Sequence, residues 1–403
     1  MSVQKKVLLA FSGGLDTSYC VKYLSETCGM EVHTAIVNTG GFSAQELSQI
    51  EERAYALGAA THTTLDETKA LYNQCLRYLV FGNVLKNNTY PLSVSAERVF
   101  QARAIAQLAK TMNVDCVAHG STGAGNDQVR FDVVFHTLIP NVEIITPIRD
   151  NKLSREEEIE FLNSCGVEGD WTKALYSINQ GIWGTTIGGK ETLTSHLPLP
   201  EKAYPTRATA TEERVITLHF ERGEFVGING EMLAHPTEAI QALTKLADEF
   251  AIGRDMHIGD TIIGIKGRVA FTAGAPLLII KAHHALEKHT LTKWQLNLKD
   301  QLALWYGQLL HEGQFAEPAL RSIEAFFEQS QQTVHGEVHV RLAPYRFSIE
   351  GISSPNDLMN STFGKYGEMN NTWSGKDVEG YSRIAANQAL IYHAVNGGNH
   401  DSR

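Results

Sequence analysis

The sequence lacks the features that mark secreted, membrane-spanning and zinc-binding chains. Its five cysteines among 403 residues form no Cys-x-x-Cys pair, so neither a disulfide framework nor a structural zinc site is expected. No apolar run approaches the length of a membrane span, and no leader with a positive start and an apolar core is found. These absences predict a cytoplasmic protein with no membrane partner.

Positive charge is also scarce. Lysine and arginine total 35 against 45 acidic residues, and the net charge of −10 argues against broad nucleic-acid binding. Of the sixteen histidines, His283, His284 and His289 lack a companion carboxylate pattern, so a packed or solvated role is expected and no metal site is predicted. A hydrophobic content of 43% in a chain of this length is typical of a globular protein of two or more domains.

A glycine turn near the N-terminus carries most of the functional signal. The apolar run Val7–Phe11 predicts a buried strand, Ser12–Gly14 predicts a tight turn, and Asp16–Ser18 opens an amphipathic helix. Paired glycines let the backbone approach an anion, while the helix start offers unpaired N–H groups and the hydroxyls add donors. The loop therefore predicts a phosphate site, unless it is a plain Gly-Gly turn. It has neither the Gly-Lys-Ser/Thr of a Walker A loop nor Gly-x-Gly-x-x-Gly spacing.

Strand and helix patterns alternate over the first part of the chain. Helical patterns at 43–57 and 96–112 and a capping box at Ser154–Glu157 separate apolar strand patterns. Such alternation predicts an α/β fold, with a doubly wound parallel sheet and ligands at the carboxyl ends of its strands. The predicted strands are 7–11, 31–37, 61–65, 115–118 and 143–148.

The pattern changes beyond about residue 166. Two antiparallel pairs are expected, 215–220 with 225–228 beside an Asn229-Gly230 turn signal, and 334–342 with 345–352. Helices are expected at 237–250, 275–310, 318–329 and 378–395, the last with an apolar face that docks on its own body or on a neighbouring subunit. The predicted domains are an ATP-binding domain (1–165), an α+β second domain (166–375) and a C-terminal helix and tail (376–403).

A second loop, residues 119–132, is rich in glycine and polar side chains. Asn126, Asp127 and Arg130 supply a donor, an anion and a fixed-charge fork, which suits a zwitterionic amino acid beside a nucleotide. The alternative is an Asx-rich surface turn, with Asp127 as a helix N-cap.

Together the two loops resemble one family. Ser-Gly-Gly-Leu-Asp-Thr-Ser (12–18) is the loop of N-type ATP pyrophosphatases, and His-Gly-Ser-Thr-Gly-Ala-Gly-Asn-Asp-Gln-Val-Arg-Phe (119–131) is similar to that of the argininosuccinate synthases. The segment Gly253–Asp260 fits the same family, so the resemblance covers essentially the whole chain. It implies an arginine-biosynthesis ligase in which ATP adenylates the ureido oxygen of citrulline and aspartate then displaces AMP. It also implies Mg²⁺ with the phosphates and a homotetramer built through the C-terminal helix.

The resemblance assigns roles by matching position. ATP-binding positions are Ala10, Phe11, Ser12, Gly13, Gly14, Leu15, Asp16, Thr17, Ser18, Val37 and Gly120, with Val37 and Gly120 at the adenosine. Aspartate-binding positions are Thr122, Asn126 and Asp127, and citrulline-binding positions are Tyr90, Ser95, Asn126, Arg130, Ser177 and Thr186. The catalytic set is Ser12, Asp16, Thr17, Ser18 and Asp127, and no residue is assigned as a metal ligand.

The chain departs from the family pattern near the α-amino end of citrulline. Gly259 stands where the family has a citrulline-binding glutamate, and Phe271 replaces a citrulline-binding tyrosine. In a separate segment, Thr186 stands where a second serine is usual. Losing the glutamate would leave an ammonium unpaired, at a cost of several kcal/mol. One hypothesis is therefore a substrate acylated on its α-nitrogen. The alternative is that Asp260 replaces the lost carboxylate and free citrulline is used.

Other readings of the first loop remain. A tRNA-modifying thiolase would need a basic surface and a cysteine pair, and an amide-forming nucleotide synthetase would need an ammonia-supplying domain; neither feature is visible. A non-catalytic nucleotide sensor is the binding-module alternative, and the intact Ser12, Asp16 and Asp127 count against it.

Overall fold

The computed structural model describes residues 4–167, 169, 176–364, 366–368 and 372–397. The chain divides into two compact units, Met1–Ser354 and Pro355–Arg403. The expected division at residue 165 falls inside the first unit and stays a prediction. Among the described residues, no helix is long and apolar enough to cross a membrane.

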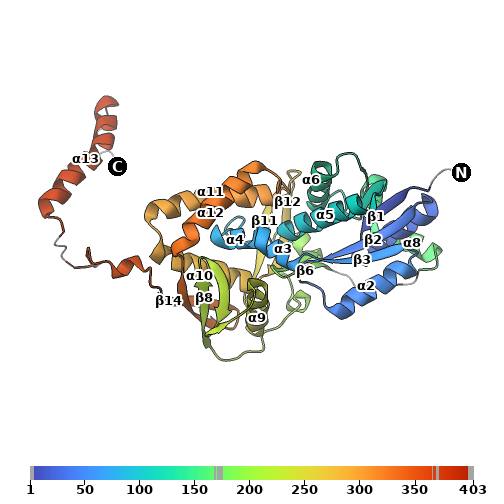
Figure 1. Ribbon diagram of the computed structural model, residues 1–403, viewed down its shortest axis with the longest axis horizontal. Helices are drawn as coiled ribbons and strands as arrows, with labels where there is room; N and C mark the ends of the chain where they lie inside the picture. The colour runs from blue at the N-terminus through green and yellow to red at the C-terminus, as the bar shows by residue number, and fades with distance from the viewer. Residues whose placement is uncertain (1–3, 168, 170–175, 365, 369–371, 398–403) are drawn as a thin grey trace. The chain divides into compact units, whose positions relative to one another are not determined.

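A five-stranded parallel sheet forms the N-terminal part of the first unit and confirms the predicted doubly wound fold (Figure 1). Alternate residues of the central strand β1 face opposite sides, as the two-residue period of a strand requires. Val7 and Leu9 pack with side chains of α1, α2 and α8, whereas Leu8 packs with α5 and α6. The strand order is β3-β2-β1-β4-β5, with β1 Lys6–Ala10, β2 Glu31–Asn38, β3 Thr61–Asp66, β4 Cys116–His119 and β5 Glu143–Ile145.

Two helices of this part begin where the sequence predicts, whereas α5 begins three residues before the predicted 96 and the predicted strand 143–148 ends at Ile145, because Pro147 starts a helix. Ser43 and Ser154 both form complete capping boxes with the glutamate three residues on, and these start α2 and α8. The helices are α1 Leu15–Lys22, α2 Ala44–Ala56, α3 Thr68–Leu71, α4 Arg77–Phe81, α5 Ser93–Met112, α6 Asp127–Leu138, α7 Pro147–Asn151 and α8 Arg155–Ser164.

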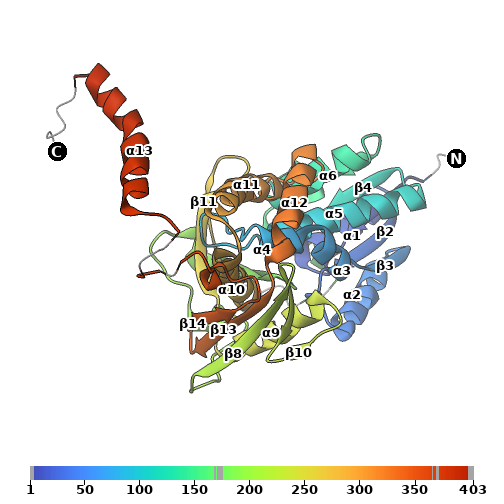
Figure 2. The same ribbon diagram turned by 60° about the vertical axis from the view of Figure 1, so that its left-hand side comes forward.

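The predicted antiparallel pairs are confirmed and belong to one sheet, ordered β10-β9-β8-β13-β14 (Figure 2). Its strands are β8 Arg214–Glu221, β9 Glu224–Ile228, β10 Glu231–Met232, β13 Gly336–Ala343 and β14 Arg346–Ser353. Helices α9 Pro236–Glu249 and α12 Pro318–Ser330 also match their predictions.

A third sheet, ordered β11-β12-β7-β6, was not predicted. Its strands β6 Tyr176–Gly181 and β7 Gly184–Gly189 are polar and glycine-rich, a composition that is depleted in strands generally. They pair with each other and, through β7, with the hairpin β11 Arg254–Asp260 and β12 Lys266–Thr272. Long-range pairing therefore forms these strands where local propensity does not.

The single helix predicted over 275–310 is wrong, because the structure has two helices there. α10 (Gly274–Thr290) ends at Leu291, which is extended, and Thr292 starts α11 (Lys293–His311) with a capping box to Gln295. The break returns α11 so that Lys299 Nζ lies 3.0 Å from Glu287 Oε2, with both side chains fully buried. His283 is packed in the same place, as predicted.

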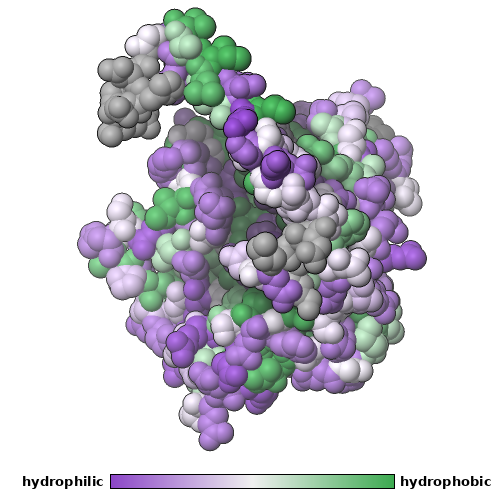
Figure 3. Space-filling model, turned by 90° about the vertical axis from the view of Figure 1, so that its left-hand side faces the viewer, coloured by the Kyte–Doolittle hydropathy of each residue, from purple (hydrophilic) through white to green (hydrophobic). Residues whose placement is uncertain are grey.

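The second unit contains the predicted C-terminal helix, α13 (Gly375–Val395), which begins with a capping box at Ser374. Several of its large apolar side chains are exposed, including Tyr381, Ile384 and Ile391. Large apolar side chains are also exposed on α11, among them Trp294, Leu304 and Trp305. On the face drawn in Figure 3, hydrophobic and polar residues are intermixed. An apolar helix surface of this kind is normally covered by another surface.

Candidate active site

The phosphate loop joins the end of β1 to the start of α1. Gly13 has φ +74°, which favours glycine, and Gly14 caps the helix without any side-chain hydrogen bond. The Ser12 and Thr17 hydroxyls lie 3.3 Å apart, so their oxygen atoms converge on the turn. Ser12 and Gly14 are exposed. The loop therefore presents unpaired backbone N–H groups and hydroxyls to an incoming anion.

Gly120 brings the second loop against the phosphate loop. A Cβ placed on it would lie 3.3 Å from the Asp16 backbone carbon and 3.3 Å from Thr17 Cγ2. Distances this short are tighter than most Cβ contacts, so a larger residue would push the loops apart. The two motifs, more than a hundred residues apart in the sequence, thus share one wall.

A network of polar side chains holds the second loop. His119 Nε2 lies 3.0 Å from Asp132 Oδ1, and Arg149 donates to the other oxygen of that carboxylate at 2.5 Å. Gln128 Nε2 donates to the carbonyl oxygen of Gly123 at 2.6 Å. Thr122 lies on the exposed part of the loop, as a residue that meets a substrate should. These hydrogen bonds hold the second loop on the side that faces the protein, and the outer side of the loop stays exposed to solvent.

Asp127 lies between two arginines. Its Oδ2 accepts from Arg98 Nε at 2.9 Å and its Oδ1 from Arg130 Nη1 at 3.0 Å. Burial alone would raise the pKa of this carboxyl, but the two guanidinium groups outweigh burial and the pKa is lowered. The side chain is still 32% exposed, so the carboxylate can take a further donor. It does not cap α6, since Asn126 is the cap residue.

Arg130 is buried, and its N–H groups hydrogen-bond to other groups of the protein. It donates to Ser95 Oγ at 2.9 Å and to the His311 carbonyl at 3.0 Å, and its Nη2 lies 3.3 Å from His311 Nδ1. Because a guanidinium only donates, His311 Nδ1 is the acceptor and the ring proton sits on Nε2. Burial, followed by the charge of Arg130, lowers the pKa of His311 to about 3. We call Ser95, Arg98, Asp127, Arg130 and His311 the site cluster.

Tyr90 adjoins the site cluster but is itself buried. Its hydroxyl lies 3.0 Å from Ser93 Oγ and accepts from the Val94 amide at 3.0 Å. Its ring packs against His257 and Phe271, with centroids 5.2 and 5.4 Å away. Burial raises the pKa of Tyr90 to about 12, so the phenol stays neutral.

The unpredicted third sheet carries the two remaining predicted citrulline contacts. Thr186 on β7 pairs with Asn179 on one side and Phe271 on the other, so these three lie in one row. Ser177 is two residues from Asn179 on β6 and therefore shares its face. Arg98 Nη2 donates to Asn179 Oδ1 at 2.5 Å, which connects this face to Asp127.

The tip of the β11–β12 hairpin reaches the second loop. Asn126 Oδ1 accepts from the Ile262 amide at 2.8 Å. The amide nitrogen of Asn126 remains for a substrate. This hydrogen bond holds the tip of the hairpin against the second loop at Asn126.

Three predicted ATP-site residues direct their side chains into the core. Phe11, Leu15 and Val37 are each at most 6% exposed. They can meet a nucleotide only through their backbone. Ser18 is fully buried, and its hydroxyl has no hydrogen-bond partner among the described residues.

Two carboxyl groups meet beside the phosphate loop. Glu158 on α8 is buried, and burial together with Asp16 raises its pKa to about 8, with one Glu158 oxygen lacking a partner in the described part of the chain. No group of three or more His, Cys, Asp or Glu that could hold a metal is present among the described residues. Mg²⁺ is commonly held by one or two carboxylates plus substrate phosphates and water, so Asp16 fits such a role.

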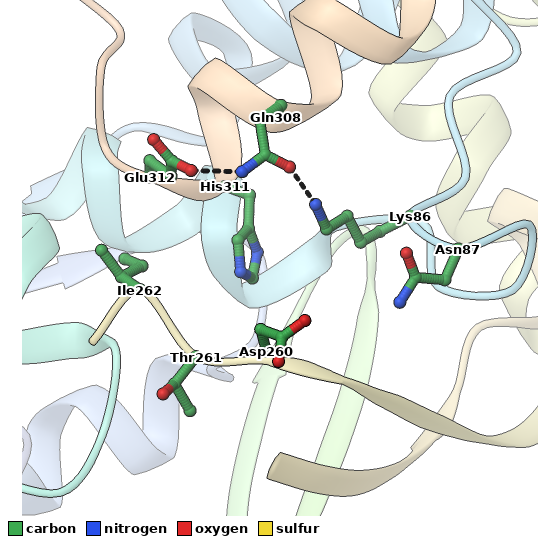
Figure 4. Close-up of a pocket in the computed structure, with 8 residues that line it drawn as sticks. All are labelled: Lys86, Asn87, Asp260, Thr261, Ile262, Gln308, His311 and Glu312. Carbon is green, nitrogen blue, oxygen red and sulfur yellow. Dashed lines mark hydrogen bonds between the residues drawn. The ribbon is translucent and has the colours of Figure 1, made fainter. Parts of the chain in front are cut away.

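A polar pocket of about 190 Å³ opens next to the site cluster (Figure 4). His311 projects into it from the end of α11, opposite Asp260 on β11. Gln308 connects Lys86 and Glu312, since its amide accepts from the Lys86 ammonium and donates to the Glu312 carboxylate. The polar pocket is lined by Lys86, Asn87, Asp260, Thr261, Ile262, Gln308, His311 and Glu312.

Comparison with known proteins matches two family models. Residues 6–168 match the arginosuccinate synthase N-terminal HUP domain, and residues 176–392 match the arginosuccinate synthase C-terminal domain. The argininosuccinate synthase of Xanthomonas campestris pv. campestris is 34% identical over 404 residues, which cover 97% of this chain and 99% of the relative. That of Dictyoglomus thermophilum is 34% identical over 400 residues (99% and 100%), and that of Methanocaldococcus jannaschii 32% over 393 residues (97% and 98%).

The chain belongs to the argininosuccinate synthase family. It is accordingly a ligase, and the predicted family resemblance is confirmed over nearly the whole length. The HUP domain match agrees with the nucleotide site predicted at the first loop.

Two departures from the family pattern lie apart in the structure. Gly259 pairs with Gly267 across the β11–β12 hairpin, four residues from Phe271 along β12. That register separates them by roughly 13 Å. Phe271 is fully buried against Tyr90, whereas Gly259 borders the polar pocket through Asn87. Of the two, only Gly259 changes the surface that a substrate could meet.

Two site residues of this argininosuccinate synthase family member were not predicted from the sequence. Arg98 lies one turn after Ser95 on α5, inside a long helical pattern that predicts only packing. His311 ends a helix that the sequence predicted as part of a longer one. A charged residue at a buried helical position was the one available clue to Arg98, because buried arginines are nearly always paired.

Proposed function

We propose that this chain joins citrulline and L-aspartate to give argininosuccinate, AMP and diphosphate through a citrullyl-adenylate. The observation that carries the proposal is the contact of Gly120 with Asp16 and Thr17. It sets an amino-acid loop directly beside a phosphate loop, as a reaction between an activated ureido group and an amine requires.

The phosphate loop holds the ATP tail in this proposal. The Gly13–Gly14 backbone and the hydroxyls of Ser12 and Thr17 would bind the phosphates, with the buried Ser18 behind them, while the ureido oxygen attacks the α-phosphorus and diphosphate leaves. Mg²⁺, bound to Asp16 and the phosphates, would neutralise phosphate charge. Val37 and Gly120 would meet the adenosine.

The second loop holds aspartate. Each Asp127 oxygen keeps a lone pair after accepting from one arginine, so the carboxylate can accept from the attacking amine. Thr122 and the Asn126 amide would bind the carboxylates of the substrate. The amine attacks the ureido carbon, AMP leaves, and the amine loses its proton, so positioning contributes much of the rate.

Citrulline would lie between α5, the second loop and the third sheet. Its carboxylate is assigned to Ser95 and Arg130, which are hydrogen-bonded to each other in this structure, so a donor of this pair would turn toward the substrate on binding. Tyr90 would adjoin the same place. Ser177, Thr186 and the Asn126 amide would contact the rest of the molecule.

The test is release of AMP and diphosphate from ATP, aspartate and a panel of ureido acids. We expect release only when both amino-acid substrates are present. Nucleotide binding without AMP formation under every condition would overturn the ligase proposal and favour a nucleotide sensor.

We also propose a homotetramer assembled through α13, supported by the exposed Tyr381, Ile384 and Ile391. Light scattering should give four chains per particle. A chain shortened before Ser374 should give a smaller particle, and an unchanged mass would contradict this role.

A further inference from the structure

We propose that the outer face of α11 binds the same face of a second copy of this chain, with the two helices antiparallel. The inference rests on the proposed homotetramer and adds to it a second contact besides α13. It is carried by three observations: large apolar side chains exposed in one row of α11, an open depression within this row, and the match between the row and its own reverse.

One row of α11 (Figure 1) exposes large apolar side chains. Trp294 and Trp305 are 70% and 65% exposed, and Leu298 and Leu304 are exposed as well. Positions 294, 298, 301 and 305 are three or four residues apart, so they lie in line along one face of the helix. We call these four residues the α11 row. A surface patch that is rich in aromatic side chains is typical of a contact between proteins.

The α11 row contains an open depression. The depression has a volume of about 340 Å³ and is lined by Trp294, Asn297, Leu298, Asp300 and Gln301. Four of these five residues are uncharged, and charged residues are likewise depleted at the centre of protein interfaces. A large apolar side chain from a partner can therefore enter the depression without burying an unpaired charge of its own.

The α11 row matches its own reverse. Trp294 precedes Leu298 by four residues, and Gln301 precedes Trp305 by four residues. If a second α11 lies antiparallel about a two-fold axis between residues 299 and 300, Trp305 of each copy meets Trp294 of the other, and Leu298 meets Gln301. The tryptophan of one copy then lies at the depression of the other. A contact between identical surfaces needs such self-complementarity, which favours a second copy of α11 over an unrelated partner.

The α11 row provides the centre of an interface of ordinary size. Its two tryptophans, 70% and 65% exposed, contribute roughly 300 Å² per copy, and Leu298 adds to this area. A standard interface buries about 800 Å² per partner. Most of the binding energy of an interface is concentrated in a few central residues, and tryptophan is enriched among them.

The proposed homotetramer also requires a second kind of contact. Four identical chains arranged about perpendicular two-fold axes need two different contacts between copies. The exposed apolar side chains of α13 provide one contact in the proposed function. The α11 row provides the other.

The test exchanges charges across the contact in the full chain and measures the mass of the particle by light scattering. Trp294→Glu/Trp305→Glu places like charges opposite each other, so the Kd of the contact should rise about a hundredfold or more and the particle should fall from four chains to two. Trp294→Glu/Trp305→Lys places each glutamate opposite a lysine of the other copy, so its Kd should be about tenfold or more below that of the first variant. Parallel helices would place like charges together in both variants.

The matched control is Met232→Glu, which adds a charge at an exposed apolar residue of β10 and should leave the mass unchanged. Circular dichroism checks the fold of each variant. If a charged variant does not fold, Trp294→Gln/Trp305→Gln takes its place and should also lower the mass, and an unchanged mass would overturn the inference.

Equal masses and equal Kd values for the two charged variants would overturn the inference, because the α11 row would then be covered by another surface, such as α13 of a second copy, or by none. The proposed α13 contact fails separately. A parent chain that forms only a dimer, and that becomes a monomer with Trp294→Glu/Trp305→Glu, would support the α11 contact without a tetramer. AMP release tests the ligase function independently of either contact.

Discussion

The first unit contains two groups of buried charges that differ in how completely they are closed. In the sealed cluster (Asn83, His283, Glu287, Lys299 and Gln331), the Glu287 carboxylate receives Gln331 Nε2 at 2.8 Å, Asn83 Nδ2 at 2.5 Å and the Lys299 ammonium. Both ions of the pair are fully buried. In the site cluster, by contrast, the Asp127 carboxylate is 32% exposed and can accept a further hydrogen bond.

The comparison distinguishes charges that stabilise the fold from charges that are available to bind a substrate. Burial alone would raise the pKa of Glu287, but His283 and Lys299 outweigh burial and lower the pKa, so the sealed cluster is already neutralised from within. In the site cluster, Arg98 and Arg130 both donate to one partly exposed carboxylate, Asp127. A substrate that supplies a donor completes it.

The largest expected effect comes from opening the sealed cluster. Glu287→Gln leaves the buried Lys299 ammonium with only the longer 3.9 Å pairing to the exposed Asp300 and should lower the free energy of unfolding by about 3 kcal/mol. Urea denaturation measures this. The matched control is Glu143→Gln, which removes an ion pair of the same 3.0 Å length that is exposed on both sides, and it should cost at most about 1 kcal/mol. Equal losses would show that burial does not distinguish the two pairs.

A substitution in the site cluster should change the kinetics of the reaction. Asp127→Asn removes the anion between Arg98 and Arg130 and should lower kcat/KM for aspartate about a hundredfold, because charged hydrogen bonds are lost to the substrate and to both arginines. Steady-state AMP release measures it, with the exposed Asp150→Asn as control. Full turnover by Asp127→Asn would remove this residue from the aspartate site.

The pH dependence of stability should reveal the protonation state of Glu97. This carboxyl is buried next to Arg98, and one of its oxygens has no hydrogen-bond partner among the described residues. Burial raises its pKa to about 8. The unfolded chain ionises near pH 4.5 and the folded chain does not, so stability should fall between about pH 4.5 and 8 and level off above.

Glu97→Gln should remove this part of the pH dependence. The difference in thermal midpoint between the variant and the parent chain should therefore increase in the variant's favour from pH 5 to pH 8. A constant difference across that range would mean that Glu97 is ionised in the folded protein.

The smallest effect should come from the helix start that both clusters share. Thr292→Ala removes the cap of α11 and should cost about 1 kcal/mol of stability. Ser43→Ala removes an equivalent capping box of α2 and should cost about the same. Only Thr292→Ala should also lower kcat/KM, because α11 carries His311. Identical activities for the two variants would show that the cap of α11 does not affect the active site.

Local signals explain what was predicted. The Gly13–Gly14 turn, the second-loop glycines and the serine caps act within a few residues, so the parallel sheet and both loops follow from the sequence. The two antiparallel pairs 215–228 and 334–352 are likewise local patterns with clear turns.

What was missed depends on contacts between distant segments. β6 and β7 are glycine-rich and form because β12 pairs with β7. Gly181 has no side chain because a Cβ there would overlap the Glu97 carboxyl on α5. Arg98 and His311 become site residues only when α5, α6 and α11 meet. The family resemblance supplied the proposed citrulline positions, whereas Arg98 and His311, which belong to no motif, needed the structure.

The break at Leu291–Thr292 also sets a register. As one straight helix, residues 274–311 would extend about 57 Å, and Glu287 and Lys299 would be separated by about 18 Å along its axis. Because each residue advances a helix by about 100°, inserting or deleting one residue at the start of α11 would turn Lys299 and His311 away from their partners together. The register of α11 is thus constrained at two positions, by the Lys299–Glu287 ion pair in the core and by the contact of His311 with Arg130.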